Sequence, residues 1–154
     1  MEELSFNSME EILLYAINEE EGAYIFYGEQ AKKTNKPELK SMLERLSMDE
    51  LRHKDILSNL FRRLEKEGEE NITFRNRDVT DYTPEYIPER EYSAMEEVII
   101  NAIQDENNTF FMYRYLASKM NHPKHKEIFQ TLASEELKHR DDLLIELNGY
   151  TNTL

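Results

Sequence analysis

The sequence predicts an all-α protein, a four-helix bundle made of two helix hairpins that are joined by a long crossover. Only 4 glycines and 4 prolines interrupt its 154 residues, and residues that favour helices dominate the rest. When the chain is shifted by 86 residues, residues 11–60 lie over residues 97–146 without a gap. This internal repeat indicates two copies of one helix hairpin. Each copy also has an Asn-x-Pro tripeptide near its middle, where one helix is expected to end and the next to begin.

Local signals place the ends of the four helices. An S-x-x-E sequence with the spacing of a capping box opens each half, and proline suits the first turn of the second helix in each half. Glycine and asparagine favour helix ends. The start signals are Ser8 with Glu11, Pro37, Ser93 with Glu96, and Pro123, and the stop signals are Gly68 and Asn148-Gly149. The expected helices span about 8–33, 37–67, 93–119 and 123–148.

The segment 68–92 is the only long connection, and residues 1–154 are expected to form a single domain. An extended segment of this length reaches about 80 Å, whereas a helix of about thirty residues is about 45 Å long. The crossover can therefore return along the whole bundle. Its larger side chains are expected to pack it against the bundle or a partner subunit; they are Tyr82, Tyr86, Ile87 and Tyr92.

Composition excludes several classes of function. A formal net charge of −13 argues against nucleic acid as a partner. The absence of cysteine excludes disulfides, thiolate zinc sites and iron–sulfur clusters, so any metal must bind to carboxylate and imidazole groups. No apolar run is long enough to span a bilayer, and the chain does not open with a signal-peptide pattern. We therefore expect a cytoplasmic protein that has no membrane partner.

Polar residues interrupt the apolar stripes of all four expected helices. In the second helix, Leu46 and Leu57 flank Glu50 and His53 at alternating spacings of four and three. The first and third helices have a single glutamate in the stripe, and the second and fourth have Glu-x-x-His, which puts both side chains on one face. These six residues, our predicted metal ligands, are Glu20, Glu50, His53, Glu106, Glu136 and His139.

Four carboxylates at one level of a bundle core would carry a charge of −4. Burying that much like charge costs several kcal/mol per ion, so the groups need compensation. Two divalent cations cancel the charge. Oxygen and nitrogen ligands without sulfur favour two ions of iron or manganese, or a mixed iron–manganese pair. Glu50 and Glu136 are the expected bridges between the ions, and Glu20 and Glu106 the terminal ligands.

Other residues near the cluster have weaker signals. Tyr27 and Tyr113 follow Glu20 and Glu106 by two turns on the same face. Their hydroxyls either act in catalysis, by hydrogen-bonding a ligand or supplying an electron, or belong to two ordinary core tyrosines. Asp49 and Glu135 each precede an expected bridging glutamate and are candidates to orient the histidine of the opposite motif.

Four residues close to these motifs in sequence are expected at the surface. Glu19 and Glu21 flank Glu20 but do not share its apolar face or match Glu106 in the repeat, so we expect both to be solvated. His122 and His125 lie at the start of the fourth helix, away from the predicted ligands, and are interpreted as surface histidines at a helix end.

The motifs resemble those of the rubrerythrin-type members of the ferritin-like superfamily. The resemblance rests on Glu20-x-x-Ala23-x-x-Phe26-Tyr27 followed by Asp49-Glu50-x-x-His53, and on their repetition as Glu106…Tyr113 and Glu136-x-x-His139. It covers about 100 of the 154 residues. It implies a ferritin-like four-helix bundle, a non-haem di-iron site made of the six ligands named above, and an oxidoreductase that reacts with dioxygen or hydrogen peroxide.

The chain also departs from that pattern. Rubrerythrins proper carry a cysteine-ligated rubredoxin domain, and this cysteine-free chain would take electrons from an external donor protein or from ferrous iron itself. They also use an additional glutamate one turn after the third-helix ligand, where this chain has Thr109. Seven residues from Asn148 onward are too few for the fifth helix of storage ferritins.

Two other functions stay open at the level of sequence. The first is a di-iron hydroxylase of an unknown organic substrate, since hydroxylases share similar Glu and Glu-x-x-His pairs. The second is an iron- or manganese-binding protein without turnover. Because bundles of this kind often pair, a homodimer is the expected oligomeric state.

Overall fold

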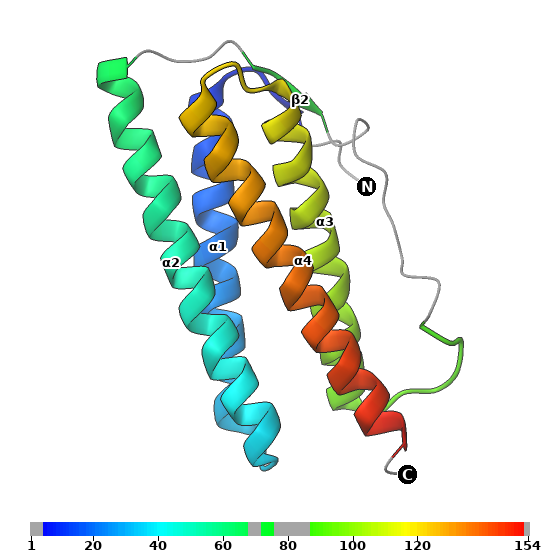
Figure 1. Ribbon diagram of the computed structural model, residues 1–154. Coiled ribbons are helices and arrows are strands. Elements are labelled where there is room, and N and C mark those ends of the chain that lie inside the picture. Colours follow the sequence, from blue (N-terminus) through cyan, green and yellow to red (C-terminus); the bar gives the residue numbers. More distant parts are fainter. Residues whose placement is uncertain (1–4, 68–71, 76–86, 153–154) are drawn as a thin grey trace. The chain divides into compact units, whose positions relative to one another are not determined.

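The computed structural model describes residues 5–67, 72–75 and 87–152. Its elements are β1 (Ser5–Phe6), α1 (Met9–Lys33), α2 (Pro37–Glu67), β2 (Phe74–Arg75), α3 (Ala94–Lys119) and α4 (Pro123–Asn152). The helices pack closely as the antiparallel pairs α1–α2 and α3–α4, so the predicted all-α class and its two hairpins are confirmed (Figure 1). The chain divides into two compact units between Phe74 and Arg75, with one hairpin in each.

The predicted helix boundaries agree closely with the structure except at the end of α4. The first and third helices begin one residue later than expected because Ser8 and Ser93 are N-caps. The prediction that the fourth helix ends at Asn148-Gly149 is wrong, since α4 continues to Asn152. Gly149 does not adopt a left-handed backbone conformation, and glycine within a helix costs only about 1 kcal/mol relative to alanine. It therefore does not have to stop the helix.

In the first hairpin, apolar stripes of α1 and α2 form the core. The leucine stripe predicted for the second helix is buried in full; it contains Leu39, Leu43, Leu46, Leu57, Leu60 and Leu64. The helices approach closely where the Ser47 hydroxyl donates a 2.7 Å hydrogen bond to the carbonyl oxygen of Tyr24. Gly28 lies at the same place, and a Cβ added to it would lie 3.4 Å from Ser47 Oγ. A small residue there allows the helices to pack tightly one turn from Glu50.

The two short strands pair at the open end of the first hairpin. β1 precedes α1, and β2 follows α2 along the chain. The Phe6 ring contacts Tyr15, with ring centroids 5.0 Å apart, and stacks on Phe74 at 6.1 Å. Phe74 is buried. These aromatic contacts hold the chain before α1 against the residues that come after α2.

In the second hairpin, the start of α3 is held by a complete capping box. The Ser93 hydroxyl accepts a hydrogen bond from the Glu96 backbone N–H, and the Glu96 carboxylate accepts one from the Ser93 N–H. Arg90 Nη2 lies 2.6 Å from the same carboxylate, and its guanidinium stacks on the Tyr92 ring. The Ser93 N–H and the Arg90 guanidinium hold the pKa of the Glu96 carboxyl below its usual range.

Much of the predicted crossover lies outside the described residues, and so do Tyr82, Tyr86 and the helix stop at Gly68. Ile87 and Tyr92 are described, and both are half-buried. None of the helices in the described part of the chain is long and apolar enough to cross a membrane.

Candidate metal centre

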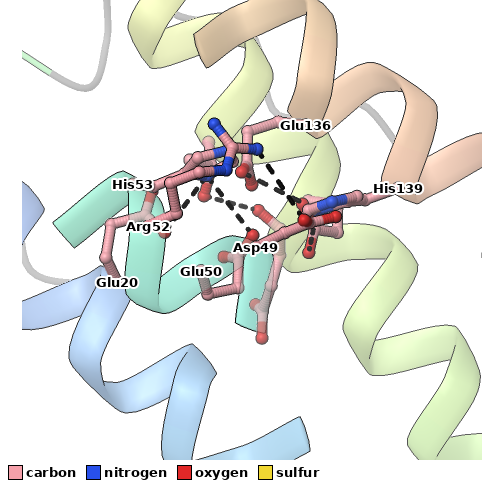
Figure 2. Close-up of polar contacts among 10 residues, drawn as sticks. Glu20, Asp49, Glu50, Arg52, His53, Glu136 and His139 are labelled. Atoms are coloured by element: carbon pink, nitrogen blue, oxygen red, sulfur yellow. Dashed lines mark hydrogen bonds and ion pairs between the residues drawn. The ribbon is translucent and has the colours of Figure 1, made fainter. Parts of the chain in front are cut away.

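The first hairpin gathers one histidine and two glutamates at one level. α1 supplies Glu20, and α2 supplies Glu50 and His53 from one face, because residues three apart in a helix are neighbours. All three are buried, with exposed fractions of 2%, 2% and 0%. His53 Nδ1 lies 3.6 Å from Glu20 Oε2 and 3.5 Å from Glu50 Oε1 (Figure 2). The imidazole nitrogen therefore faces carboxylates from both helices.

The second hairpin repeats this arrangement. α3 supplies Glu106, and α4 supplies Glu136 and His139. Their exposed fractions are 3%, 1% and 2%. His139 Nδ1 lies 3.6 Å from Glu106 Oε1 and 3.8 Å from Glu136 Oε1. Each hairpin thus contains a group of the same composition and geometry, as the 86-residue repeat predicts.

The spacing within each group fits metal coordination. One ligand atom from each of Glu20, Glu50 and His53 can be chosen so that all lie within 4.8 Å of one another, and the same is true of Glu106, Glu136 and His139. Two atoms bound about 2.1 Å from one ion at angles of about 90–120° lie about 3.0–3.6 Å apart. Three of the observed nitrogen–oxygen separations, at 3.5–3.6 Å, lie at the upper end of that range, and the fourth, at 3.8 Å, lies slightly above it. The side chains could therefore bind an ion with small adjustments.

Charge supports the same interpretation. Each hairpin buries two carboxylates beside one imidazole, and when both carboxylates are ionised the group carries about −2. Burying such a pair without compensation costs several kcal/mol per ion. One divalent cation in each hairpin would balance the carboxylates, and a neutral imidazole supplies a further lone pair. The donor set of oxygen and nitrogen suits iron or manganese better than a metal that prefers sulfur.

Both tyrosines that follow the helix-one and helix-three glutamates are buried. Tyr27 is 2% exposed and Tyr113 is 0% exposed. The Tyr113 ring packs on Phe129 of α4, with centroids 5.9 Å apart, and the Tyr27 ring meets Phe26 edge-on. Both rings thus belong to the core of their hairpins. A catalytic role for their hydroxyls stays a prediction.

Charged neighbours border the carboxylates of both hairpins. In α2, Asp49 is partly exposed and lies 3.7 Å from Arg52 (Figure 2). In α3, partial desolvation raises the pKa of the Asp105 carboxyl, and the neighbouring Glu106 charge raises it further. The expected action of Asp49 and Glu135 on the histidine of the opposite motif is still a prediction.

Thr109, which stands one turn after Glu106, donates its hydroxyl to its own helix. Its Oγ1 lies 2.9 Å from the carbonyl oxygen of Asp105. Thr109 is half-buried, as is Ala23, its counterpart in the first hairpin. Neither position carries a carboxylate or an imidazole, so neither adds a strong ligand to the group in its hairpin.

One expectation about the histidines is wrong. His125 is not at the surface but buried, with an exposed fraction of 2%. It stacks on the half-buried His122, with ring centroids 4.1 Å apart. The sequence did contain the necessary signal, because the 86-residue offset pairs His125 with Leu39, a fully buried core position. Glu19 and Glu21 are exposed, as predicted.

Sequence reasoning missed the polar contacts beside the two groups. Lys54 donates a hydrogen bond to the exposed Glu21, and Arg140 donates one to the fully buried Asn107. Each contact joins the residue after a predicted glutamate ligand to the residue after a predicted histidine ligand. The 86-residue repeat aligns the two pairs with each other, but only the structure shows that their side chains meet.

Comparison with known proteins assigns the chain to a family. The model of the Rubrerythrin family matches residues 11–147. The chain belongs to the rubrerythrin family. The match includes all six predicted ligands and all four helices except a few terminal residues. Comparisons with curated proteins and with solved structures gave no significant match. Family membership therefore agrees with the resemblance inferred from the motifs, and it adds no information about substrate.

Proposed function

We propose that this protein is a non-haem di-iron oxidoreductase that reacts with dioxygen or hydrogen peroxide. One observation supports it most strongly: each hairpin buries a Glu, Glu, His group with the same register and nearly the same distances. Membership in the rubrerythrin family favours iron as the metal. In this proposal the chain binds two ions, the number that the resemblance to rubrerythrins implies.

The six side chains divide into two kinds of ligand. Glu50 and Glu136 would bridge the ions, because each lies one helical turn from a histidine that binds only one ion. Glu20 and Glu106 would each bind a single ion. Four carboxylates and two divalent ions give a neutral centre, which removes the electrostatic cost of burying the carboxylates. Bound ferrous ions would supply the electrons that reduce dioxygen or hydrogen peroxide.

The protein's own residues would set the conditions for that chemistry. Burial of all six ligands keeps bulk water away from them. The hydroxyls of Tyr27 and Tyr113, whose rings are buried in their hairpins, would orient a carboxylate or deliver an electron. Because the chain has no cysteine, electrons would come from a separate donor protein or from the ferrous ions themselves. We also expect a cytoplasmic homodimer.

Metal binding without turnover is the second candidate. It is favoured by Thr109, which stands where the resemblance to rubrerythrins places an additional glutamate linked to peroxide chemistry. The Thr109 hydroxyl bonds to its own helix and does not replace a carboxylate. Because the resemblance links that glutamate to peroxide chemistry, Thr109 weakens the case for a peroxidase-like reaction in particular. The two candidates differ in whether the iron is oxidised with consumption of an oxidant.

To test the proposal, the protein is loaded with ferrous iron in the absence of oxygen, and the bound iron is measured. Dioxygen or hydrogen peroxide is then added, and its consumption is followed together with the near-ultraviolet absorption of ferric iron. We expect two irons per chain and oxidant consumption in proportion to iron. A Glu50→Gln variant should lose both, whereas Glu44→Gln, an exposed glutamate of the same helix, should keep both. Two bound irons without consumption of the oxidant would support the metal-binding protein without turnover. A chain that binds neither iron nor, in a parallel titration, manganese would overturn both candidates.

A further inference from the structure

The residues that directly follow the proposed ligands join the two helices of each hairpin. In the first hairpin, Lys54 Nζ donates a 3.1 Å hydrogen bond to Glu21 Oε1. In the second, Arg140 Nη1 donates a 2.8 Å hydrogen bond to Asn107 Oδ1. The 86-residue offset maps Glu21 onto Asn107 and Lys54 onto Arg140. Equivalent positions of the two hairpins thus form a contact between helices, with a lysine and a glutamate in the first hairpin and an arginine and an asparagine in the second.

We propose that Asn107 and Arg140 are positioning residues that hold Glu106 and His139 in the geometry needed to bind an ion. This proposal rests on the proposed di-metal function. Successive helical residues point about 100° apart, so the Asn107–Arg140 contact lies beside the ligand pair at the same level of the hairpin. There it fixes both the spacing of α3 and α4 and their rotation about their own axes.

Burial makes the second contact the more rigid of the two. Asn107 is 0% exposed, and the Arg140 side chain is 17% exposed. The corresponding Lys54 and Glu21 side chains are 28% and 48% exposed. Exposed ion pairs contribute little to stability and weaken as the salt concentration rises. A buried hydrogen bond from a charged donor is stronger, and salt screens it less. The second hairpin should therefore keep its ligand geometry at high ionic strength.

The Arg140 guanidinium is also fixed on its other side. Its Nε and Nη2 lie 3.3 Å and 3.2 Å from the same carboxylate oxygen, Asp141 Oδ1. Two partners therefore define the plane of the guanidinium, which a flexible lysine ammonium does not offer. Asp141 is more than half exposed, so it restrains Arg140 from the solvent side while Asn107 restrains it from within.

The first hairpin has a further polar contact between its helices near the proposed ligands. One turn before Glu50, the Ser47 hydroxyl bonds to the Tyr24 carbonyl oxygen across the α1–α2 interface. The repeat places Ala133 at the position of Ser47, and alanine has no hydroxyl. Removal of the Asn107–Arg140 contact should therefore disturb the ligands of the second hairpin more than removal of Lys54 disturbs those of the first.

The test measures metal binding by the full-length chain. Ferrous iron and, separately, manganese are titrated without oxygen into the parent protein, Asn107→Ala and the matched control Lys54→Ala. We expect Asn107→Ala to weaken one of the two binding steps about 10-fold, as is typical when a group that orients a ligand is lost. Lys54→Ala should change both steps by no more than about 2-fold, and less at high salt.

A conservative replacement separates positioning from general loss of stability. Arg140→Lys keeps the positive charge but has no planar group that two partners can hold. It should weaken the same single binding step as Asn107→Ala, by less than about 10-fold, and leave the other step unchanged. A general loss of stability would instead weaken both steps. If Asn107→Ala does not fold, as judged by circular dichroism, Arg140→Lys alone decides by whether one step or both steps weaken.

The measurements distinguish failure of the positioning role from failure of the proposed function. If the parent protein binds two ions but Asn107→Ala and Lys54→Ala have equal effects, the positioning role is wrong and the proposed function stands. An Arg140→Lys variant that weakens both binding steps equally also overturns the positioning role. If the parent protein binds neither iron nor manganese, the proposed function fails, and the positioning role fails with it.

Discussion

Replacing Glu20 with glutamine should change stability in opposite directions with and without metal. Glu20 is 2% exposed, and one of its oxygens lies within 4.8 Å of one from Glu50. Two ionised carboxylates at that distance repel by about 3 kcal/mol at an effective dielectric constant of about 20. In a chelator, the neutral amide should therefore raise the free energy of unfolding by about 1–3 kcal/mol.

With metal bound, Glu20→Gln should lower the free energy of unfolding relative to the parent protein instead of raising it. An ion at 100 times its dissociation constant stabilises the folded parent protein by about 2.7 kcal/mol at each site. In a domain of this size that corresponds to a rise in melting temperature of about 5–11 °C. Glu20→Gln removes one ligand and should lose most of this rise. Thermal unfolding followed by circular dichroism, with a chelator or with manganese, measures both effects on the same preparations.

A neighbouring glutamate provides the control. Glu19 is exposed on the same helix, so Glu19→Gln makes the same chemical change without relieving buried charge. It should alter stability by less than about 0.5 kcal/mol under either condition. The reasoning is refuted if Glu20→Gln destabilises the metal-free protein by more than about 1 kcal/mol and metal does not stabilise the parent. Glu20 would then be a structural partner of its neighbours and not a metal ligand.

Three further substitutions test the helices that carry the ligands. Ser93→Ala removes the N-cap of α3 and should cost about 1 kcal/mol in urea unfolding. The depressed pKa of Glu96 means that its stabilising contribution is present above its ordinary value of 4.5 and is lost as pH falls through the lower value in the folded protein. Stability measured between pH 3 and 6 should therefore depend less steeply on pH in Glu96→Gln. Gly22→Ala should stabilise α1 by about 0.5–1 kcal/mol in thermal unfolding, because a Cβ there meets no atom within 4 Å; an unchanged or lower stability would contradict this.

The internal repeat made it possible to predict the six ligands from the sequence. A single Glu-x-x-His is a common surface pattern, but Glu50-x-x-His53 and Glu136-x-x-His139 share one offset and one apolar stripe. Burial follows from that stripe, because residues at the same helical phase as core leucines face the same side. The same rule correctly applied would have placed His125 in the core, since it occupies the phase of Leu39. Its misplacement came from weighting residue type above register.

The end of α4 and the contacts between helices needed three-dimensional information. Local sequence suggests a stop at Gly149, but a glycine that need not adopt a left-handed conformation can remain helical. Likewise, no pattern within a single helix reveals that Arg140 reaches Asn107. That contact depends on how two helices approach each other and on which side chains their interface leaves room for.

The sequence by itself determined the helical class, the two hairpins and the phase of the six predicted ligands, because helix periodicity and capping act over only a few residues. Tertiary structure decided which groups share a level, how far their atoms are apart and which contacts are shielded from water. Glu21–Lys54 and Asn107–Arg140 occupy equivalent positions in the sequence, yet one is exposed and the other buried. Burial depends on the packing of whole helices, and that packing is a property of the folded hairpin as a unit.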